Sequence, residues 1–270
     1  MAYCAPGSVP RLEKHGTCFD ATALRKLASI YNKHYPTRAI ENVGGMSDKQ
    51  LKVEMEKRFS ESCDEMCWVK KLGVEHDPVI EKHLLPKMPE EWKEAPRTWL
   101  TNFNIEVVMR KYEDLYSDFV FMDVYPSDFC SYNGVCDIPF DGKYYGMIIN
   151  LSDHTGSGSH WTALFVCTDK KMACYGAYYY DSVGNAPPKE MKALMDGLKK
   201  KGGATFKTVV NKKQHQYKNT ECGMFSMFYI IKWLHWVHKD PTTTHLDIVR
   251  NKLISDDHVF QLRKIFFRTV

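Results

Sequence analysis

A cysteine at the start of an apolar segment is the residue of this chain best suited to act as a nucleophile. Cys222 follows the polar run 214–221 and precedes the segment 224–237, which carries one charge in fourteen residues. That segment is too short to span a bilayer, which takes about 20 residues, but it suits a buried helix. Asn219 and Thr220 are types that cap helix N-termini, where unpaired N–H groups and the helix dipole favour a thiolate. An isolated Cys before an apolar helix is more often a small core residue. Whether Cys222 is a nucleophile therefore depends on the polar residues that could accompany it in a site.

A nucleophilic cysteine needs a general base, a group that orients the base, and donors for the oxyanion. His160 begins a strand-like apolar run after a Gly- and Ser-rich loop, and Asp181 follows the next such run, 177–180. If these strands pair as antiparallel neighbours, His160 and Asp181 lie near the same end and the carboxylate can hold the imidazole. Gln216, six residues before Cys222, has a side-chain N–H suited to the oxyanion.

The order and spacing of these motifs resemble the ubiquitin-like-protein-specific cysteine protease family, to which adenovirus protease and the deSUMOylases belong. The motifs are LTNFNI at 100–105, GSHW at 158–161, SVGNAPP at 182–188 and TECG at 220–223, within residues 98 to 235. The resemblance implies that Cys222 is the nucleophile, His160 the general base and then acid, Asp181 the orienter and Gln216 the oxyanion residue. A viral member has Asn at the position of Asp181, which leaves open what the negative charge contributes.

The resemblance also implies a fold and a substrate site. The expected fold is α+β, with a papain-like, adenovirus-protease-type core in which helices flank a central mixed β-sheet, and with an N-terminal helical domain. Trp161 alone is more often a core aromatic, but in this family it covers a narrow groove. Gly158, Ser159 and Gly223 are expected to bind substrate beside it.

The function implied is a cysteine endopeptidase that cuts after Gly-Gly in structural polyproteins of a large DNA virus during virion maturation. A deSUMOylating or deubiquitinating isopeptidase is the alternative enzyme, because the spacing of the triad does not separate the two. An acyltransferase and a non-catalytic scaffold that binds ubiquitin-like proteins are alternatives of other classes. The expected partner is a protein with Gly-Gly sites, either a viral structural precursor or a ubiquitin-like protein, with no cofactor, no metal and no membrane insertion.

Length and composition predict two unequal units. With 270 residues and 44% hydrophobic content, the chain can bury one large core and a smaller one. Four prolines between residues 78 and 96 indicate a linker, so we expect an arm, a helical domain and a Pro-rich linker over 1–96 and the catalytic domain over 97–270. No signal peptide is expected, so nothing points outside the cell. The viral resemblance then implies the host cytoplasm at the virus assembly site and the virion. Nine cysteines, an odd number, are expected to be reduced and free of disulfides.

Hydrophobic periodicity and turn residues predict the elements. Residues 1–16 show no periodicity and are expected to form a loose arm. Helices are predicted at 17–35, from 47 onward, and at 99–116, 189–201, 244–253 and 257–267. Strands are predicted at 119–122, 144–150, in the run that His160 begins, and at 177–180 and 205–210.

Two further binding sites have support in the sequence but are not favoured. Cys63 and Cys67, with Cys4, His15 and Cys18 upstream, are residue types that bind zinc, yet their spacing is ordinary and helix packing explains them. The basic cluster from Lys199 to Lys213 is compatible with a DNA cofactor. No aromatic residue interleaves these lysines, so a solvated helix end explains them better than DNA.

Overall fold

The computed structural model describes residues 3–60, 62–239 and 252–269. The chain forms two compact units: unit 1 comprises Met1–Met88 with Phe266–Val270, and unit 2 comprises Pro89–Ile265. The compact units divide after Met88, and the last residues of the chain belong with unit 1. The domain boundary near residue 96 stays a prediction. Among the described residues, none of the helices has the length and apolar character needed to cross a membrane.

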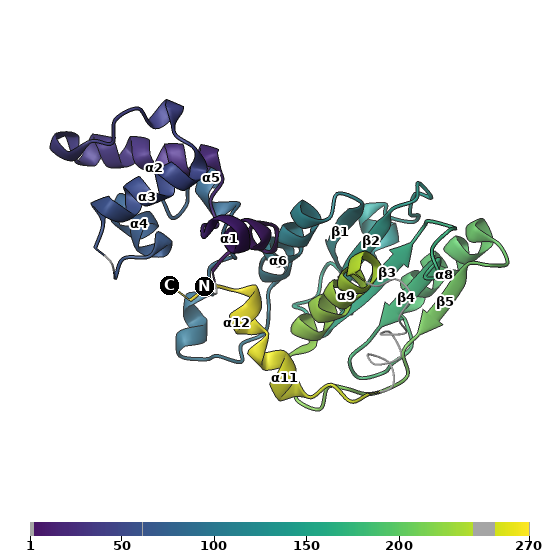
Figure 1. Cartoon of the computed structure of the whole chain (residues 1–270). Coiled ribbons are helices and arrows are strands. Elements are labelled where there is room, and N and C mark those ends of the chain that lie inside the picture. The colour runs from purple at the N-terminus through teal and green to yellow at the C-terminus, as the bar shows by residue number, and fades with distance from the viewer. Residues whose placement is uncertain (1–2, 61, 240–251, 270) are drawn as a thin grey trace. The chain divides into compact units, whose positions relative to one another are not determined.

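Unit 2 is built on a five-stranded mixed sheet whose strands lie in chain order (Figure 1). The strands are β1 (Phe119–Tyr125), β2 (Tyr144–Asn150), β3 (Trp161–Cys167), β4 (Gly176–Tyr180) and β5 (Lys207–Val210). The pairs β1–β2 and β4–β5 are parallel, whereas β2–β3 and β3–β4 are antiparallel. Every predicted strand is present, and the predicted α+β class with a central mixed sheet is confirmed.

One face of the sheet is covered by the apolar helix predicted from the sequence. This helix is α9 (Cys222–Lys239), which packs on β2 and β3. Its Trp233 stacks on Phe165 of β3, with 4.7 Å between ring centroids. Helix α6 (Asn102–Leu115) packs against β1 and α9, as Figure 1 also shows.

The opposite face is covered by α8 (Lys189–Gly202), an amphipathic helix. Its Met191 and Leu194 join a buried cluster with Leu164 and Val166, whose side chains alternate with those facing α9. Three shorter helices complete the described part of unit 2 after residue 100: α7 (Phe129–Asn133), α11 (Asp256–Gln261) and most of α12 (Arg263–Phe266). A 3₁₀ turn, η4 (Glu90–Lys93), lies near its start. The central strands are thus buried on both sides, which explains their nearly continuous apolar sequences.

Unit 1 is a helical unit with its own core. Its helices are α1 (Val9–His15), α2 (Ala21–His34), α3 (Asp48–Arg58), α4 (Glu65–Leu72) and α5 (Pro78–Glu81), with 3₁₀ turns at η1 (Pro6–Ser8), η2 (Pro36–Arg38) and η3 (Val43–Gly45). Leu24, Leu27 and Tyr31 of α2 are buried in one cluster with Leu51 of α3 and Trp68 of α4. The predicted N-terminal helical region is confirmed.

The prediction of a loose N-terminal arm is wrong. Residues 9–15 form α1, whose start tolerates Pro10 because the first N–H groups of a helix need no intrahelical partner. The residues before it pair with the segment after α5: Leu85 N–H donates to the Tyr3 carbonyl at 2.7 Å, and Ala5 N–H donates to the His83 carbonyl at 2.9 Å. The arm is therefore docked through non-local backbone contacts that no periodicity reveals.

The expectation of free cysteines throughout is also contradicted. The structure pairs Cys4 with Cys18, Cys63 with Cys67, and Cys130 with Cys136. The fold brings their Cα atoms to 5.5, 5.1 and 4.6 Å, within the range that a disulfide requires. The four cysteines considered for zinc are thus consumed in two disulfides.

The C-terminal helices were predicted in part. The helix expected at 257–267 is present as α11 and α12. The helix expected at 244–253 lies, except for its last two residues, outside the described residues. The described residues Lys252 and Leu253 are not helical.

Candidate active site

Cys222 is the first residue of α9, as predicted, and its side chain is almost completely buried, with 2% exposed. The residue before the helix is Glu221, whose carbonyl accepts the first helical hydrogen bond from Phe225 N–H at 2.9 Å. Glu221 thus stands where Asn219 or Thr220 was expected as a cap. Free N–H groups at this end of the helix surround the thiol with positive partial charge, which favours a thiolate.

His160 and Asp181 are brought together by strand pairing. Strands β3 and β4 are antiparallel, with Ala163 opposite Tyr180, so the residue before β3 and the residue after β4 meet at one edge. His160 Nε2 lies 2.8 Å from Asp181 Oδ1, and the same oxygen accepts the Val183 N–H at 2.9 Å. Because Nε2 is engaged by Asp181, Nδ1 is the imidazole nitrogen left to face Cys222.

The electrostatics of His160 suit a charged imidazole. Burial by itself lowers the pKa of His160, but the hydrogen bond to Asp181 and the interaction with the Cys222 thiol outweigh it and raise the pKa to about 9. At neutral pH the imidazole therefore carries a proton beside the thiol. An imidazolium next to a cysteine stabilises the thiolate, which is the reactive form.

Asn211 holds the backbone of Asp181 and was not predicted. Its Oδ1 accepts the Asp181 N–H at 2.8 Å, and its Nδ2 donates to the Asp181 carbonyl at 2.8 Å. Asn211 directly follows β5, which runs parallel to β4. The only signal in the sequence was that Asn211 is a polar residue at the end of a predicted strand. The sequence did not indicate that this strand pairs with the one that ends at Asp181.

Gln216 is buried beside the turn that follows Asp181. Its Oε1 accepts the Ser182 hydroxyl at 2.6 Å, and the Gln216 backbone N–H donates to the Ser182 carbonyl at 2.9 Å. Its Nε2 donates to the Lys218 carbonyl. A side-chain amide has two N–H donors, and the contacts within the described part of the chain use one of them.

Trp161 lies directly over the start of α9. Its Nε1–H donates to the Leu100 carbonyl at 3.1 Å, which fixes the indole against the segment before α6. A Cβ atom on Gly223 would lie 3.0 Å from Leu100 Cδ1 and 3.2 Å from Trp161 Cδ1. Any larger residue at 223 would push these side chains away, so the glycine permits a close-packed wall next to Cys222.

A cavity of about 530 Å³ begins at Trp161. Its walls come from residues 99–102, residues 124–126, Tyr132 and the loop 150–158. Gly158 is in this wall with φ +94°, a conformation that only glycine adopts easily. Ser159 does not line the cavity. Its N–H donates to Asn150 Oδ1 at 3.0 Å and its hydroxyl accepts the Ser152 hydroxyl at 3.1 Å, and these two bonds order the loop.

Comparison with known proteins agrees with this arrangement. The Ulp1 protease family, in its C-terminal catalytic domain, matches residues 132–264. A cysteine protease of African swine fever virus is 31% identical over 193 residues, which cover 63% of this chain and 67% of the viral protein. This chain belongs to the Ulp1 protease family. It is therefore a cysteine protease of the viral, SUMO-protease-like type.

Two further likenesses extend over the whole chain. A protein of Acanthamoeba polyphaga mimivirus, named as a thiol protease, is 27% identical over 299 aligned residues, which cover 99% of this chain and 94% of that protein. The crystal structure of the African swine fever virus protease has a TM-score of 0.64 and covers 100% of this chain and 96% of that one at 21% identity. The likeness in fold thus includes the N-terminal helical region as well as the sheet.

Proposed function

We propose that this protease is an endopeptidase that cuts after Gly-Gly in structural polyproteins of a large DNA virus during virion maturation. In this proposal Cys222 is the nucleophile, His160 the general acid and base, Asp181 the residue that orients His160, and Gln216 the oxyanion donor. Support comes from the 2.8 Å contact between His160 and Asp181 and from the position of Cys222 at a helix start. The similarity to viral proteases supports the viral setting.

The chemistry follows from the charged pair. Cys222 Sγ attacks the carbonyl carbon of the second glycine, and the carbonyl oxygen takes up the negative charge near the Gln216 amide and the helix N–H groups. The His160 imidazolium gives its proton to the amine that leaves, which breaks the peptide bond and leaves a thioester. Neutral His160 then takes one proton from water, whose oxygen attacks the thioester and releases the carboxylic acid and the Cys222 thiolate, so the charged pair is restored.

The observation that carries the Gly-Gly specificity is the packing of Trp161 and Leu100 on Gly223. Both side chains line the cavity, and they pack on Gly223, the neighbour of Cys222, at distances that leave no room for a Cβ atom there. A substrate that reaches from the cavity to Cys222 passes this wall, and backbone without side chains passes it best. The cavity then receives the residues that precede Gly-Gly, against Trp99, Tyr132 and Gly158.

A peptide library varied at the two positions before the cut tests this specificity. We expect the native enzyme to require Gly at both positions, with Ala at either lowering kcat/KM steeply. Trp161→Ala should widen acceptance and lower the rate, because the wall is lost and alignment with it. A native preference for Leu, Arg or Asp at these positions would refute the narrow passage.

The nucleophile and base are tested by single substitutions with a matched cysteine control. Cys222→Ala and His160→Ala should each abolish turnover while leaving the fold intact, and the double variant should be no worse. Cys174→Ala is the control, because Cys174 is also a buried cysteine of unit 2 outside any disulfide but lies in the turn before β4. Turnover that survives Cys222→Ala would remove Cys222 from the proposal.

A deSUMOylating or deubiquitinating isopeptidase is the second candidate. It has specific support, since African swine fever virus relatives that are 30% identical over 193 residues are named SUMO-1 cysteine proteases. Incubation with two panels separates the candidates: Gly-Gly-containing viral structural precursors and conjugates of mature ubiquitin-like proteins. Turnover of the conjugates alone would replace the endopeptidase by the isopeptidase.

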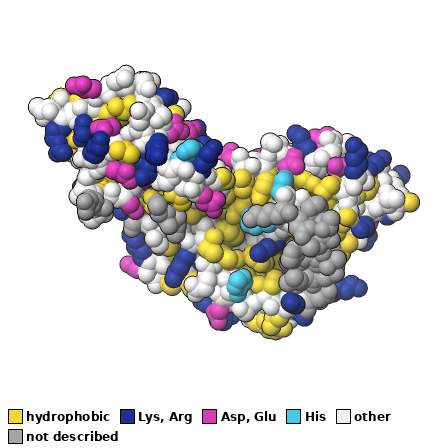
Figure 2. All heavy atoms as spheres, viewed as in Figure 1, with side chains coloured by type: hydrophobic (Ala, Val, Ile, Leu, Met, Phe, Trp, Pro, Cys, Tyr) yellow, Lys and Arg dark blue, Asp and Glu magenta, His cyan; other side chains and the backbone are white. Residues whose placement is uncertain are grey.

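The proposed partner is a protein substrate, and the proposed location is the host cytoplasm at the virus assembly site and the virion. A DNA cofactor finds little support in the basic cluster, which Figure 2 shows at the end of unit 2 that carries α8 and β5. Lys199 donates to the carbonyls of Ala204 and Phe206, and Lys201 binds Asp137 Oδ2 at 2.6 Å. These lysines are thus already engaged within the chain. Proteolysis of a peptide at equal rates with and without DNA is the expected result.

A further inference from the structure

The C-terminal segment 254–263 contacts the loop 215–221, which carries Gln216 and leads to Cys222. Its first contact is made by the backbone: Ile254 N–H donates to His215 Nδ1 at 3.2 Å, and His215 is completely buried. The other two contacts are made by Asp256 and Arg263. The segment therefore holds the loop near its start, its middle and its end.

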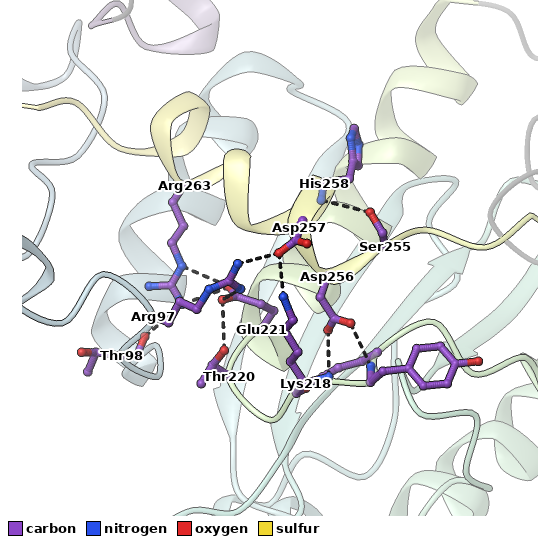
Figure 3. Close-up of polar contacts among 12 residues, drawn as sticks. Arg97, Thr98, Lys218, Thr220, Glu221, Ser255, Asp256, Asp257, His258 and Arg263 are labelled. Carbon is purple, nitrogen blue, oxygen red and sulfur yellow. Dashed lines mark hydrogen bonds and ion pairs between the residues drawn. The ribbon is translucent and has the colours of Figure 1, made fainter.

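The Asp256 side chain holds the middle of the loop by binding the backbone of the loop. Its Oδ2 accepts the Tyr217 N–H at 3.0 Å and its Oδ1 accepts the Lys218 N–H at 3.2 Å. These two residues directly follow Gln216, whose amide donates to the Lys218 carbonyl. Figure 3 shows the Asp256 carboxylate pointing at this stretch of backbone. The position of the Gln216 side chain thus depends on a peptide unit that Asp256 fixes.

Arg263 holds the end of the loop through Glu221. Its Nε donates to Glu221 Oε2 at 3.1 Å, and its second nitrogen lies 3.1 Å from the same oxygen. Arg97 reaches Glu221 Oε1 at 3.2 Å, and Thr220 donates its hydroxyl there at 3.1 Å. In Figure 3 both arginines point at Glu221. Glu221 is completely buried, so these contacts compensate a carboxylate that would otherwise be very costly.

Arg263 is itself built into the protein and is 4% exposed. Its guanidinium lies 4.2 Å from the Trp92 ring centroid, and it donates to the Thr98 carbonyl at 2.9 Å. Burial lowers the pKa of Arg263, and Glu221 partly offsets this. A buried arginine with these partners has one orientation, which makes it a rigid anchor.

From these contacts we infer that Asp256 and Arg263 are positioning residues for the proposed catalysis, Asp256 for the oxyanion residue Gln216 and Arg263, with Glu221, for the nucleophile Cys222. The inference deepens the proposed function and rests on it. Arg263 acts through two effects: it fixes the backbone of Glu221, and it balances the negative charge that directly precedes Cys222.

The charge balance gives a measurable signature. Among the described residues, the charged groups that interact with Cys222 or adjoin it include the His160 imidazolium just before β3, Arg263 of α12 and the neighbouring Glu221. Glu221→Gln removes the negative charge that directly precedes Cys222 and leaves the positive charges of Arg97 and Arg263 without it, which favours the thiolate. Arg263→Gln removes a positive charge and disfavours it. A merely structural role would lower stability in both variants without opposite effects on the thiolate.

Alkylation of Cys222 by iodoacetamide, followed as a function of pH, tests the Arg263 and Glu221 pair. The pH at which the rate is half maximal should fall in Glu221→Gln and rise in Arg263→Gln, each by about 0.5 to 1 pH unit. Circular dichroism at each pH controls for folding, and Arg263→Lys should return part of the shift. Equal midpoints in both variants, or shifts of the same sign, would overturn the assignment.

Steady-state kinetics on a Gly-Gly peptide test Asp256. We expect Asp256→Ala to lower kcat by about 10- to 100-fold with KM within about twofold, since a misplaced Gln216 weakens the transition state rather than substrate binding. Asp256→Asn keeps one acceptor, so its kcat should lie between those of the native enzyme and Asp256→Ala. Asp257→Ala is the matched control, because Asp257 binds the side chains of Lys218 and Arg97 but not the loop backbone.

The outcomes separate this inference from the proposed function. Native turnover with normal kcat in Asp256→Ala would overturn the role of Asp256 alone. If the native enzyme cuts no Gly-Gly peptide, the proposed function fails, yet the alkylation midpoints still decide whether Arg263 and Glu221 set the thiolate. A kcat loss in Asp257→Ala equal to that in Asp256→Ala would also overturn the inference, because it would reflect general disruption of the segment.

Discussion

Each unit of the molecule buries a glutamate, and the two are compensated in different ways. Glu65 of unit 1 is 4% exposed and Glu221 of unit 2 is 0% exposed. Glu65 accepts the Thr17 hydroxyl and the Cys18 N–H, the latter at 3.0 Å, and both donors are neutral. Glu221 is bound by two arginines.

The difference shows in the electrostatics. Burial raises the pKa of Glu65, and its hydrogen bonds from Thr17 and Cys18 oppose the rise without cancelling it. With neutral donors only, Glu65 has a structural role: its hydrogen bonds join the segment before α2 to the start of α4. Glu221 instead forms ion pairs with two arginines in the interior, where both charges lose their hydration at high cost. We infer that the protein tolerates this cost next to Cys222, because the balance between Glu221 and the arginines affects the reactivity of the Cys222 thiol.

The largest effect is expected at a third buried carboxylate, Asp181, whose partner is ionisable. Asp181→Ala should lower kcat by about 100- to 10,000-fold, because His160 loses the group that holds it as acid and base. Asp181→Asn should retain more activity, since its amide oxygen still accepts the Nε2 proton. Kinetics on a Gly-Gly peptide measure both. Equal losses in the two variants would mean that the charge, and not the orientation, is essential.

The same pair should make stability depend on pH. The pKa of His160 is raised to about 9 in the folded protein, above its ordinary value of 6.5. The stabilisation is therefore fully present below pH 6.5 and is lost as pH rises through 9, on the order of 3 kcal/mol in all. Urea unfolding from pH 6 to 9.5 measures this loss of stability. The control is Asp181→Asn, whose free energy of unfolding should depend less on pH over this range. Parallel curves for the two proteins would contradict the raised pKa.

A smaller effect, confined to stability, is expected from Glu65→Ala. The change leaves the Thr17 hydroxyl and the Cys18 N–H buried without their acceptor, which costs about 1 to 3 kcal/mol of unfolding free energy. The value of kcat on a short Gly-Gly peptide should not change, because Glu65 belongs to the core of unit 1. Urea unfolding and peptide kinetics on the same preparation give the comparison. A kcat loss like that of Asp181→Ala would erase the contrast between the two units.

The smallest effect is expected from Glu65→Gln, which keeps an acceptor and removes the ionisation. Because the pKa of Glu65 is raised in the folded state, the native protein should lose stability as pH rises from 4.5 through that raised value. Glu65→Gln should lack this loss and gain on the native protein toward neutral pH. The difference in urea midpoint between the two proteins, followed from pH 4.5 to 8, checks the sign. A native protein that gains stability relative to Glu65→Gln as pH rises would contradict it.

Local pattern was enough to predict much of unit 2. The long apolar run after Cys222 predicted α9 and its first residue, and the alternation of strands and turns predicted the paired strands that bring His160 to Asp181. Both predictions rest on short-range rules: helix starts, strand ends and antiparallel neighbours. The family motifs then pointed to the roles, which stay proposals.

The sequence by itself therefore determined the class of fold, the elements around the site and the candidate nucleophile, because each follows from residues close together in the chain. Tertiary structure alone decided which distant residues support them. Arg263 meets Glu221 across 42 residues, and Asp256 meets Tyr217 across 39. Nothing in the spacing of these residues indicates the contact, since a charged side chain in an amphipathic helix is usually solvated. These charged side chains become buried and contact the site only because the C-terminal segment 254–263 packs on the loop 215–221.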